Sequence, residues 1–123
     1  MPLSPSHIYK SFLAAARGLV YVFKNEQNFR WQLVAGLGAG GLAFIFPLRS
    51  WEVILVFLLI ISVLTMEILN TVVEKFMDLL KPRLDQYVEV IKDLMAGAVL
   101  LTALGALVIG LIIFLPYLVV LFK

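Results

Sequence analysis

The N-terminal part of the chain alternates apolar and basic positions with the spacing of an α-helix. Ser4 followed by Pro5 is typical of a helix start, because serine caps free backbone N–H groups and a proline at the first helical position needs no N–H partner. Apolar residues recur at steps of three and four: Ile8, Phe12, Leu13, Ala16, Leu19, Val20 and Phe23. Basic residues occupy the other face: Lys10, Arg17 and Lys24. The pattern predicts a basic amphipathic helix over residues 4–24 that lies on a membrane surface.

Three long apolar runs follow, over residues 31–48, 51–80 and 93–122. Hydrophobic residues make up 63% of the 123-residue chain, against about 45–50% in ordinary globular chains. A water-soluble protein of this size could not cover so much apolar surface, so the bilayer is the expected solvent. A helix crosses it with about 17–25 residues. The sequence therefore predicts a single-domain, all-α membrane protein with three spans after the surface helix.

The second apolar run is longer than a membrane requires. Residues 51–80 contain neither glycine nor proline, and as a helix they would measure about 45 Å, compared with a hydrocarbon core of about 30 Å. If Trp51 marks one boundary, Glu67 lies about 24 Å and Glu74 about 35 Å further along the axis. We therefore expect Glu67 just inside the far boundary, and Glu74 and Asp78 just outside it.

Basic residues cluster on one side of the expected membrane. Four precede the first span and four lie between the second and third: Lys10, Arg17, Lys24, Arg30, Lys75, Lys81, Arg83 and Lys92. Arg49 and Lys123 lie on the opposite side. Because lysine and arginine are enriched in cytoplasmic loops, we expect the N-terminus and the second loop in the cytoplasm.

A stripe of polar residues shares one face of the second span. Its members are three or four residues apart: Glu67, Asn70, Thr71, Glu74 and Asp78. A solvated helix end would explain Asp78 equally well, but a carboxylate at membrane depth is costly and usually faces a bundle interior or a pathway. Neighbouring carboxylates repel one another unless they share a cation. Since Mg²⁺ is usually bound by one or two carboxylates plus substrate phosphates, the stripe favours a divalent-metal phosphate site.

Other patterns exclude several kinds of site. The absence of cysteine removes disulfides, cysteine zinc sites and thiol nucleophiles, and the net charge of +2 provides no basic stripe for nucleic acid. Residues 36–41 match the G-x-G-x-x-G dinucleotide pattern, but they lie in an uncharged run with no strand before it, so we interpret the match as accidental. His7 is the single histidine, and the chain has no catalytic triad, H-E-x-x-H or P-loop motif.

Small residues recur at four-residue steps in two of the spans. The first span contains Gly36 and Gly40, and the third repeats the device at Ala98, Thr102, Ala106 and Gly110. Small side chains let helix backbones approach closely. Both stripes predict tight helix packing, either within the protomer or between copies of the chain.

Three segments closely resemble one protein family: "SFLAAARGLVYVFKNEQNFRWQL", "MEILNTVVEKFMDLL" and "IKDLMAGAVLLTALGALVIGLIIF". They are similar to the small bacterial integral-membrane lipid kinases, which comprise diacylglycerol kinase and undecaprenol kinase. The resemblance implies a homotrimer of three-span protomers in the bacterial inner (plasma) membrane, with each active site between neighbouring protomers at the cytoplasmic face. There, ATP with Mg²⁺ would phosphorylate a lipid hydroxyl.

The resemblance also implies roles for individual residues. Glu67, which opens the E-x-x-N-T segment, would act as the base, and Glu26 and Glu74 would hold the metal. The nucleotide would be bound by Asn70, Lys92 and Asp93, with His7, Arg83 and Asp85 as further candidates. The lipid would contact Ser11, Asn28, Phe29, Arg30, Glu67 and Ala96.

The chain departs from the family pattern near the nucleotide. Family members often carry an E-Y-H-like segment in the second loop, where this chain reads "PRLDQYVEVIKD", and His7 falls where some relatives place an arginine. These departures affect the expected affinity for the nucleotide and the expected preference among nucleobases.

The acceptor lipid is chosen on the segment "EQNFR", which resembles the undecaprenol-kinase branch more than the diacylglycerol branch. Undecaprenol is therefore the expected acceptor and diacylglycerol the alternative. A non-enzymatic membrane assembly protein is a more distant alternative. It would explain Glu67 and the small-residue stripes as packing, but it gives no reason for the remaining acids and Lys92 to gather on the cytoplasmic side.

Overall fold

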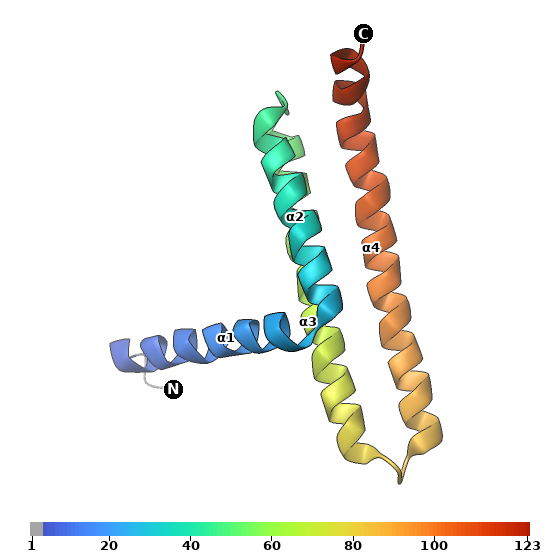
Figure 1. The fold of residues 1–123 in the computed structure, drawn as a ribbon. Helices are drawn as coiled ribbons and strands as arrows, with labels where there is room; N and C mark the ends of the chain where they lie inside the picture. The colour runs from blue at the N-terminus through green and yellow to red at the C-terminus, as the bar shows by residue number, and fades with distance from the viewer. Residues whose placement is uncertain (1–3) are drawn as a thin grey trace.

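The computed structural model describes residues 4–123, and these form helices without a strand. The helices are α1 (Pro5–Asn25), α2 (Gln27–Ile45), α3 (Ser50–Leu80) and α4 (Asp85–Leu121). In Figure 1, α2, α3 and α4 lie alongside one another as a bundle, and α1 projects sideways from it. The all-α prediction is therefore confirmed for the described residues.

α1 begins as the sequence predicts and has little protein around it. The Ser4 hydroxyl accepts a hydrogen bond from the His7 backbone N–H at 3.2 Å, and Pro5 lies in the first turn. Val22 is buried, whereas the other residues of α1 are exposed, including the apolar Phe12 at 72%. An amphipathic helix with an uncovered apolar face is suited to the plane of a membrane interface.

Small residues bring α2 close to α3. A Cβ atom added to Gly36 would lie 2.9 Å from Cγ2 of Ile60 on α3, closer than real Cβ contacts. Gly40 is buried, and a Cβ atom there would contact the Phe57 ring at 3.8 Å. Because β-branched side chains such as that of Ile60 are stiff, a larger residue than glycine at position 36 would force the helices apart. The predicted packing face on α2 therefore operates within the protomer.

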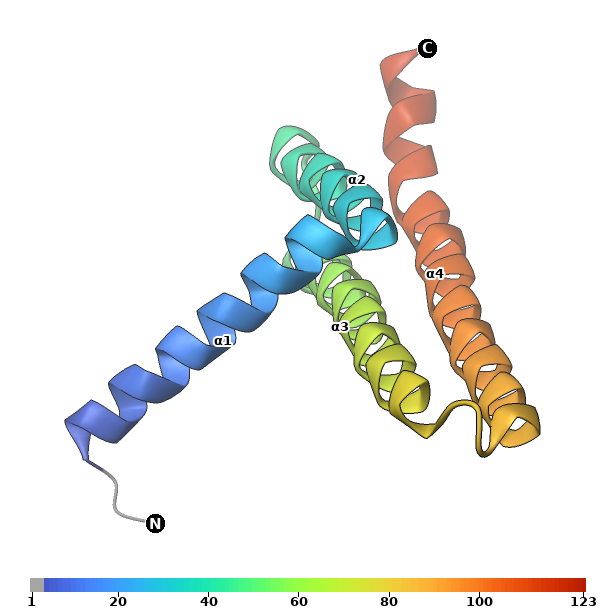
Figure 2. The ribbon, with the colours of Figure 1, turned by 60° about the horizontal axis from the view of Figure 1, so that its bottom comes forward.

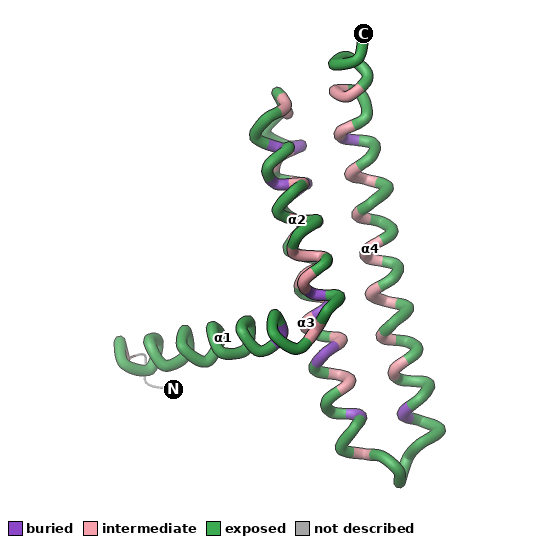
Figure 3. The backbone as a smooth tube through the Cα atoms, viewed as in Figure 1, coloured by how far each residue is buried: buried purple, intermediate pink, exposed green. Residues whose placement is uncertain are grey.

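α4 packs against α3 along much of its length. The small residues predicted to form a packing stripe on α4 are half-buried: Ala98, Thr102, Ala106 and Gly110. In Figure 3, the half-buried positions of α4 lie on the side that faces the other helices. Toward the C-terminal end of α4, a core of Ala43, Val56 and Ile113 joins α2, α3 and α4.

Two predicted helix ranges shift in the structure. α4 begins at Asp85 rather than at residue 93, because its first turns are amphipathic instead of wholly apolar and still bury Val88, at 0% exposure. α2 starts earlier than predicted because Glu26 separates it from α1, and it ends at Ile45, before Pro47. Apolar runs thus mark the hydrophobic parts of these helices but not their ends.

Among the described residues, two helices are long and apolar enough to cross a membrane. They are α3 and α4, with mean hydropathies of 2.5 and 2.9 over their most apolar stretches. Of those stretches only 22% and 6% is buried within the protein. The core helix of a soluble protein would be mostly buried, so these surfaces are suited to lipid or to other copies of the chain. The third span predicted from α2, which has 19 residues, stays a prediction.

A polar contact joins α3 to α4 at the end opposite the α3–α4 turn. The Tyr117 hydroxyl donates a hydrogen bond to Glu52 Oε1 at 2.5 Å, and the Arg49 backbone N–H donates to the same oxygen at 2.9 Å. Glu52 is 8% exposed. The two donors satisfy a carboxylate that would otherwise be costly to bury. This contact fixes the last turns of α4 to the first turn of α3.

We predict that Tyr117→Phe lowers the free energy of unfolding by about 0.6–1.7 kcal/mol, from the average to the maximum measured by double-mutant cycles for hydrogen bonds between membrane helices. The ring stays while the donor to Glu52 is lost. Tyr87→Phe is the matched control, because Tyr87 is 65% exposed on the same helix. Equilibrium unfolding in lipid bicelles measures both variants. Equal destabilisation by the two changes would contradict the prediction.

Candidate active site at the junction of α1 and the bundle

The predicted polar stripe lies on one face of α3 and passes from the interior toward solvent. Glu67 and Thr71 are 5% and 7% exposed. Asn70 and Glu74 are half-buried, and Asp78 is exposed. The Thr71 hydroxyl donates to the Glu67 backbone carbonyl at 3.1 Å, and Asn70 Nδ2 donates to Glu74 Oε1 at 3.2 Å. The stripe thus leads from a buried acid toward the α3–α4 turn.

Other acids surround the buried Glu67 carboxylate. Glu26 and Glu74 both lie close enough for their charges to act on it. Like charges in such proximity are unfavourable unless a cation or a proton is shared between them. The charges at this site therefore favour a shared cation or proton.

Glu26 reaches this site because it forms the corner between two helices. It is the single residue between α1 and α2, with an extended backbone at φ −116° and ψ 109°. Its backbone N–H donates to the Val22 carbonyl at 2.9 Å, which closes the last turn of α1. Figure 2 shows the end of α1 meeting the start of α2 beside α3. The corner therefore delivers a carboxylate to the polar face of α3.

Lys75 provides a cation near the same corner. Its ammonium lies 5.6 Å from the centroid of the Tyr21 ring on α1, within the range of a cation–π interaction. The charges of Glu26 and Asp78 also act on it. Lys75 thus links α1 to α3 at the point where the acids gather.

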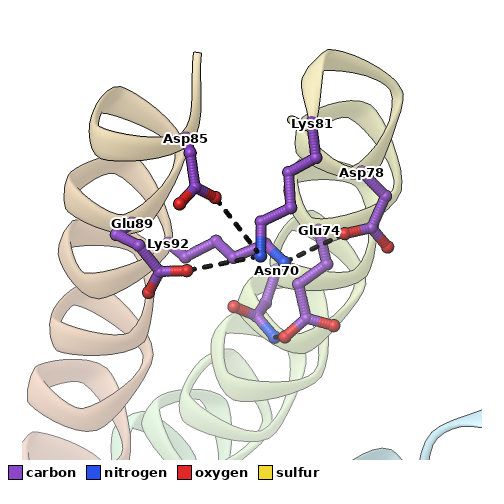
Figure 4. A network of polar contacts seen from close by, with 7 residues as sticks. All are labelled: Asn70, Glu74, Asp78, Lys81, Asp85, Glu89 and Lys92. Carbon is purple, nitrogen blue, oxygen red and sulfur yellow. Dashed lines mark hydrogen bonds and ion pairs between the residues drawn. The ribbon is translucent and has the colours of Figure 1, made fainter. Parts of the chain in front are cut away.

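A second polar group joins the ends of α3 and α4, as Figure 4 shows. Lys92 Nζ donates to Asp78 Oδ1 at 2.9 Å. Lys81 Nζ lies 3.3 Å from Glu89 Oε1 and 4.0 Å from Asp85 Oδ1. Exposed ion pairs of this kind contribute little stability, so these pairs constrain the ends of α3 and α4 only weakly.

Several predicted nucleotide residues lie apart from Glu67 within one protomer. His7 and Ser11, the latter predicted to contact lipid, lie in the first turns of α1, where the Ser11 hydroxyl donates to the His7 carbonyl at 3.1 Å. Figure 1 shows this end of α1 pointing away from the bundle. Arg83 is exposed in the α3–α4 turn, and Asp93 is exposed on α4. One protomer therefore does not bring the whole predicted set together.

The predicted lipid contacts near the corner have different surroundings. Asn28 on α2 and Ala96 on α4 are exposed. Phe29 is 5% exposed, so its ring belongs to the packing around the corner. Arg30 donates from Nη1 to two carbonyl oxygens in the last turn of α1, at 2.8 and 3.0 Å. The Phe29 ring and the Arg30 guanidinium are thus already in contact with other parts of the protomer.

The carboxylates at the corner suit a metal that arrives with a substrate. Within residues 4–123, no group of three or more histidine, aspartate or glutamate side chains has a metal-binding arrangement. The charges of Glu26 and Glu74 act on Glu67, and all three side chains offer oxygen donors. Mg²⁺ usually takes one or two carboxylates together with substrate phosphates and water. This donor set therefore fits Mg²⁺ bound with a nucleotide better than a resident structural metal.

Residues 13–114 match the model of a family described as prokaryotic diacylglycerol kinase. The chain belongs to this family. It is 34% identical over 111 residues to the undecaprenol kinase of Bacillus subtilis (strain 168), a match that covers 90% of each chain. It is 33% identical over 107 residues to a diacylglycerol kinase of Synechocystis sp. (strain ATCC 27184 / PCC 6803 / Kazusa), covering 86% of this chain and 61% of the relative. Family membership makes the chain a lipid kinase and overturns the non-enzymatic alternative.

In this lipid kinase, the polar contacts that join two helices are those that the sequence does not indicate. Lys75 enters the sequence-based prediction only through membrane orientation, and no sequence pattern indicates a partner for Glu52. Tyr21 is not singled out by its spacing, because a single sequence carries no distance from α1 to α3. The acids of α3 were found because their spacing along one helix is a local signal.

Proposed function

We propose that this kinase transfers the γ-phosphoryl group of ATP to the hydroxyl of undecaprenol, with Mg²⁺, at the cytoplasmic face of the bacterial plasma membrane. The observation that carries the proposal is the buried Glu67, with Glu26 and Glu74 beside it, in a member of the prokaryotic diacylglycerol kinase family. Phosphoryl transfer depends mainly on positioning and on charge stabilisation. Both are available along the polar face of α3.

Glu67 acts as the general base in this proposal. One of its carboxylate oxygens takes the proton of the lipid hydroxyl, the hydroxyl oxygen bonds to the γ-phosphorus, and the bond from that phosphorus to ADP breaks. The position of Glu67 near the end of the apolar run favours this role, because a lipid hydroxyl would arrive at that depth. The negative charges of Glu26 and Glu74 favour proton uptake by Glu67, because they disfavour a further negative charge beside them.

Glu26 and Glu74 hold the Mg²⁺ that accompanies ATP. The ion supplies neutralisation of the charge on the transferring phosphoryl group. Asn70 keeps the Glu74 carboxylate in place through its hydrogen bond. On α4, Lys92 exchanges its Asp78 partner for a phosphate oxygen.

The remaining nucleotide and lipid contacts come from two protomers in a homotrimer. We propose that α2 forms the third membrane span and that active sites lie between neighbouring chains. The free end of α1 then brings its residues to another protomer: His7 toward the nucleotide and Ser11 toward the lipid. Asp93, Arg83 and Asp85 lie near the nucleotide, and Asn28, Phe29, Arg30 and Ala96 border the lipid. The large unburied surfaces of α3 and α4 support an assembly of this kind.

Undecaprenol is preferred to diacylglycerol as the acceptor. The match to the Bacillus undecaprenol kinase covers 90% of both chains, whereas the match to the Synechocystis diacylglycerol kinase covers 61% of that protein. The identities are nearly equal, so diacylglycerol phosphorylation to phosphatidic acid is the second candidate function.

We predict that Glu67→Gln reduces the rate of phosphoryl transfer by about 10²- to 10⁴-fold, the usual contribution of a general base. The amide keeps the volume of the side chain but cannot take the proton. Activity with ATP and lipid, together with the oligomer mass in detergent, measures the effect. The oligomer should be unchanged. Glu89→Gln, an exposed acid on α4, is the control and should keep wild-type activity. Activity retained in Glu67→Gln would refute the base assignment.

Glu74→Ala should raise the Mg²⁺ concentration needed for half-maximal activity, or abolish activity, because a carboxylate is lost beside the phosphates. Titrating Mg²⁺ at saturating ATP and lipid measures this requirement, with Glu89→Ala as the matched control. A titration curve that superimposes on that of the wild type would argue against Glu74 as a metal ligand.

The acceptor is tested with a lipid panel. Purified kinase, γ-labelled ATP and Mg²⁺ are incubated with undecaprenol or diacylglycerol in the same mixed micelles, and kcat/KM is compared. We expect the higher value with undecaprenol. A preference for diacylglycerol would leave the kinase assignment in place and reverse the choice of substrate.

A further inference from the structure

Arg30 reaches back from α2 across the corner to the end of α1. Its Nη1 atom donates hydrogen bonds to the Phe23 carbonyl at 2.8 Å and to the Lys24 carbonyl at 3.0 Å. The Arg30 backbone N–H also donates to the Glu26 carbonyl at 3.3 Å, as part of the first turn of α2. One residue is therefore anchored in α2 and bound to α1 on the other side of Glu26.

The interaction satisfies groups that a helix end leaves free. The last four carbonyls of a helix have no partner within it, and they carry the negative end of the helix dipole. At the end of α1, Val22 O accepts from the Glu26 N–H, and Arg30 supplies donors for the next two carbonyls. A guanidinium is suited to this place because it is always charged and presents several N–H groups in a fixed plane.

The direction of α1 depends on few contacts other than this one. Val22 is the buried residue of α1, and the remaining side chains of that helix are exposed. The Lys75–Tyr21 contact adds a weak attraction to α3. A helix with so little buried surface takes its orientation largely from its corner, and Glu26 is the residue at that corner.

We propose that Arg30 is a positioning residue, which ties the C-terminal carbonyls of α1 to α2 and so holds Glu26 against the acids of α3. The lipid contact implied by the family resemblance is then secondary for this side chain. The proposal deepens the proposed function and rests on it, because it assumes that Glu26 holds Mg²⁺. The site then includes the Arg30 guanidinium, which holds the backbone in place, as well as the Glu26 carboxylate, which binds Mg²⁺ in the proposed function.

The first test measures the direction of α1 without metal, nucleotide or lipid substrate. The chain has no cysteine, so spin labels placed at Ser6→Cys on α1 and Gln86→Cys on α4 are the sole reactive sites. Labelled chain is diluted with unlabelled chain in bicelles, and the distance distribution is recorded by pulsed electron paramagnetic resonance. Arg30→Met should broaden the distribution. Arg30→Lys, whose ammonium still donates to carbonyls, should restore much of the narrow distribution, and Arg17→Met on the exposed face of α1 should leave it unchanged.

The second test separates positioning from lipid contact. In unlabelled Arg30→Met, the Mg²⁺ concentration for half-maximal activity should rise by about 10- to 100-fold, as for residues that orient metal ligands, with an unchanged KM for lipid. Arg30→Lys should show a smaller rise. If Arg30→Met does not fold, Arg30→Lys alone still decides, because a lipid-contact role predicts a raised lipid KM with wild-type Mg²⁺ dependence.

Two results would overturn the proposal in different ways. An unchanged distance distribution in Arg30→Met, with a raised lipid KM, would refute positioning and leave the proposed function standing. A broadened distribution with wild-type Mg²⁺ dependence would show that Arg30 orients α1 but that Glu26 does not depend on it for metal. That result would overturn the proposed link from Arg30 to the metal site, and the metal role of Glu26 would be refuted separately if Glu26→Gln also left the Mg²⁺ requirement unchanged.

Discussion

Glu67 places an ionisable carboxylate, at 5% exposure, on a helix that has just passed through a long apolar run. Removing a carboxylate from water is expensive unless it gains partners or a proton. The neighbouring charges here are those of two more acids, Glu26 and Glu74. The packing of α3 therefore cannot be explained by stability alone. A cation or a proton shared among these acids would relieve their mutual repulsion.

The corner between α1 and α2 shows how a nearly unburied helix can still place a carboxylate near the acids of α3. α1 buries Val22 and little else, so hydrophobic packing within the protomer cannot fix its direction. Arg30 donates hydrogen bonds to the free carbonyls at its end, and the uncovered apolar face of the helix is suited to a membrane surface. The small residues of α2 serve the same site from the other side, because the close approach at Gly36 brings the start of α2 against α3. The position of Glu26 thus depends on the carbonyls at the end of α1 and on the glycines of α2 as well as on its own backbone hydrogen bond.

The sequence was informative wherever the signal was local. The start of α1 at Ser4, the polar face of α3 and the packing role of Gly36 follow from spacing along one helix, and the structure confirms them. The start of α4 was missed because an apolar run shows where a helix is hydrophobic, whereas the first turns of α4 are amphipathic. The contacts of Arg30, Lys75 and Tyr117 were missed for a different reason. Each joins two helices, and a single sequence carries no distance between helices.

Two buried acids on α3 show how to separate structure from function in this chain. Glu52 accepts hydrogen bonds from the Tyr117 hydroxyl and the Arg49 backbone N–H, and this satisfied carboxylate caps one end of the helix. Glu67, about four turns further along the helix, is equally buried but has carboxylates for neighbours. A satisfied buried charge holds helices together, whereas one left among like charges requires a further participant to become stable. In the proposed function this participant is the Mg²⁺ that accompanies ATP, so the end of α3 that carries Glu67 is the end at which we propose the chemistry.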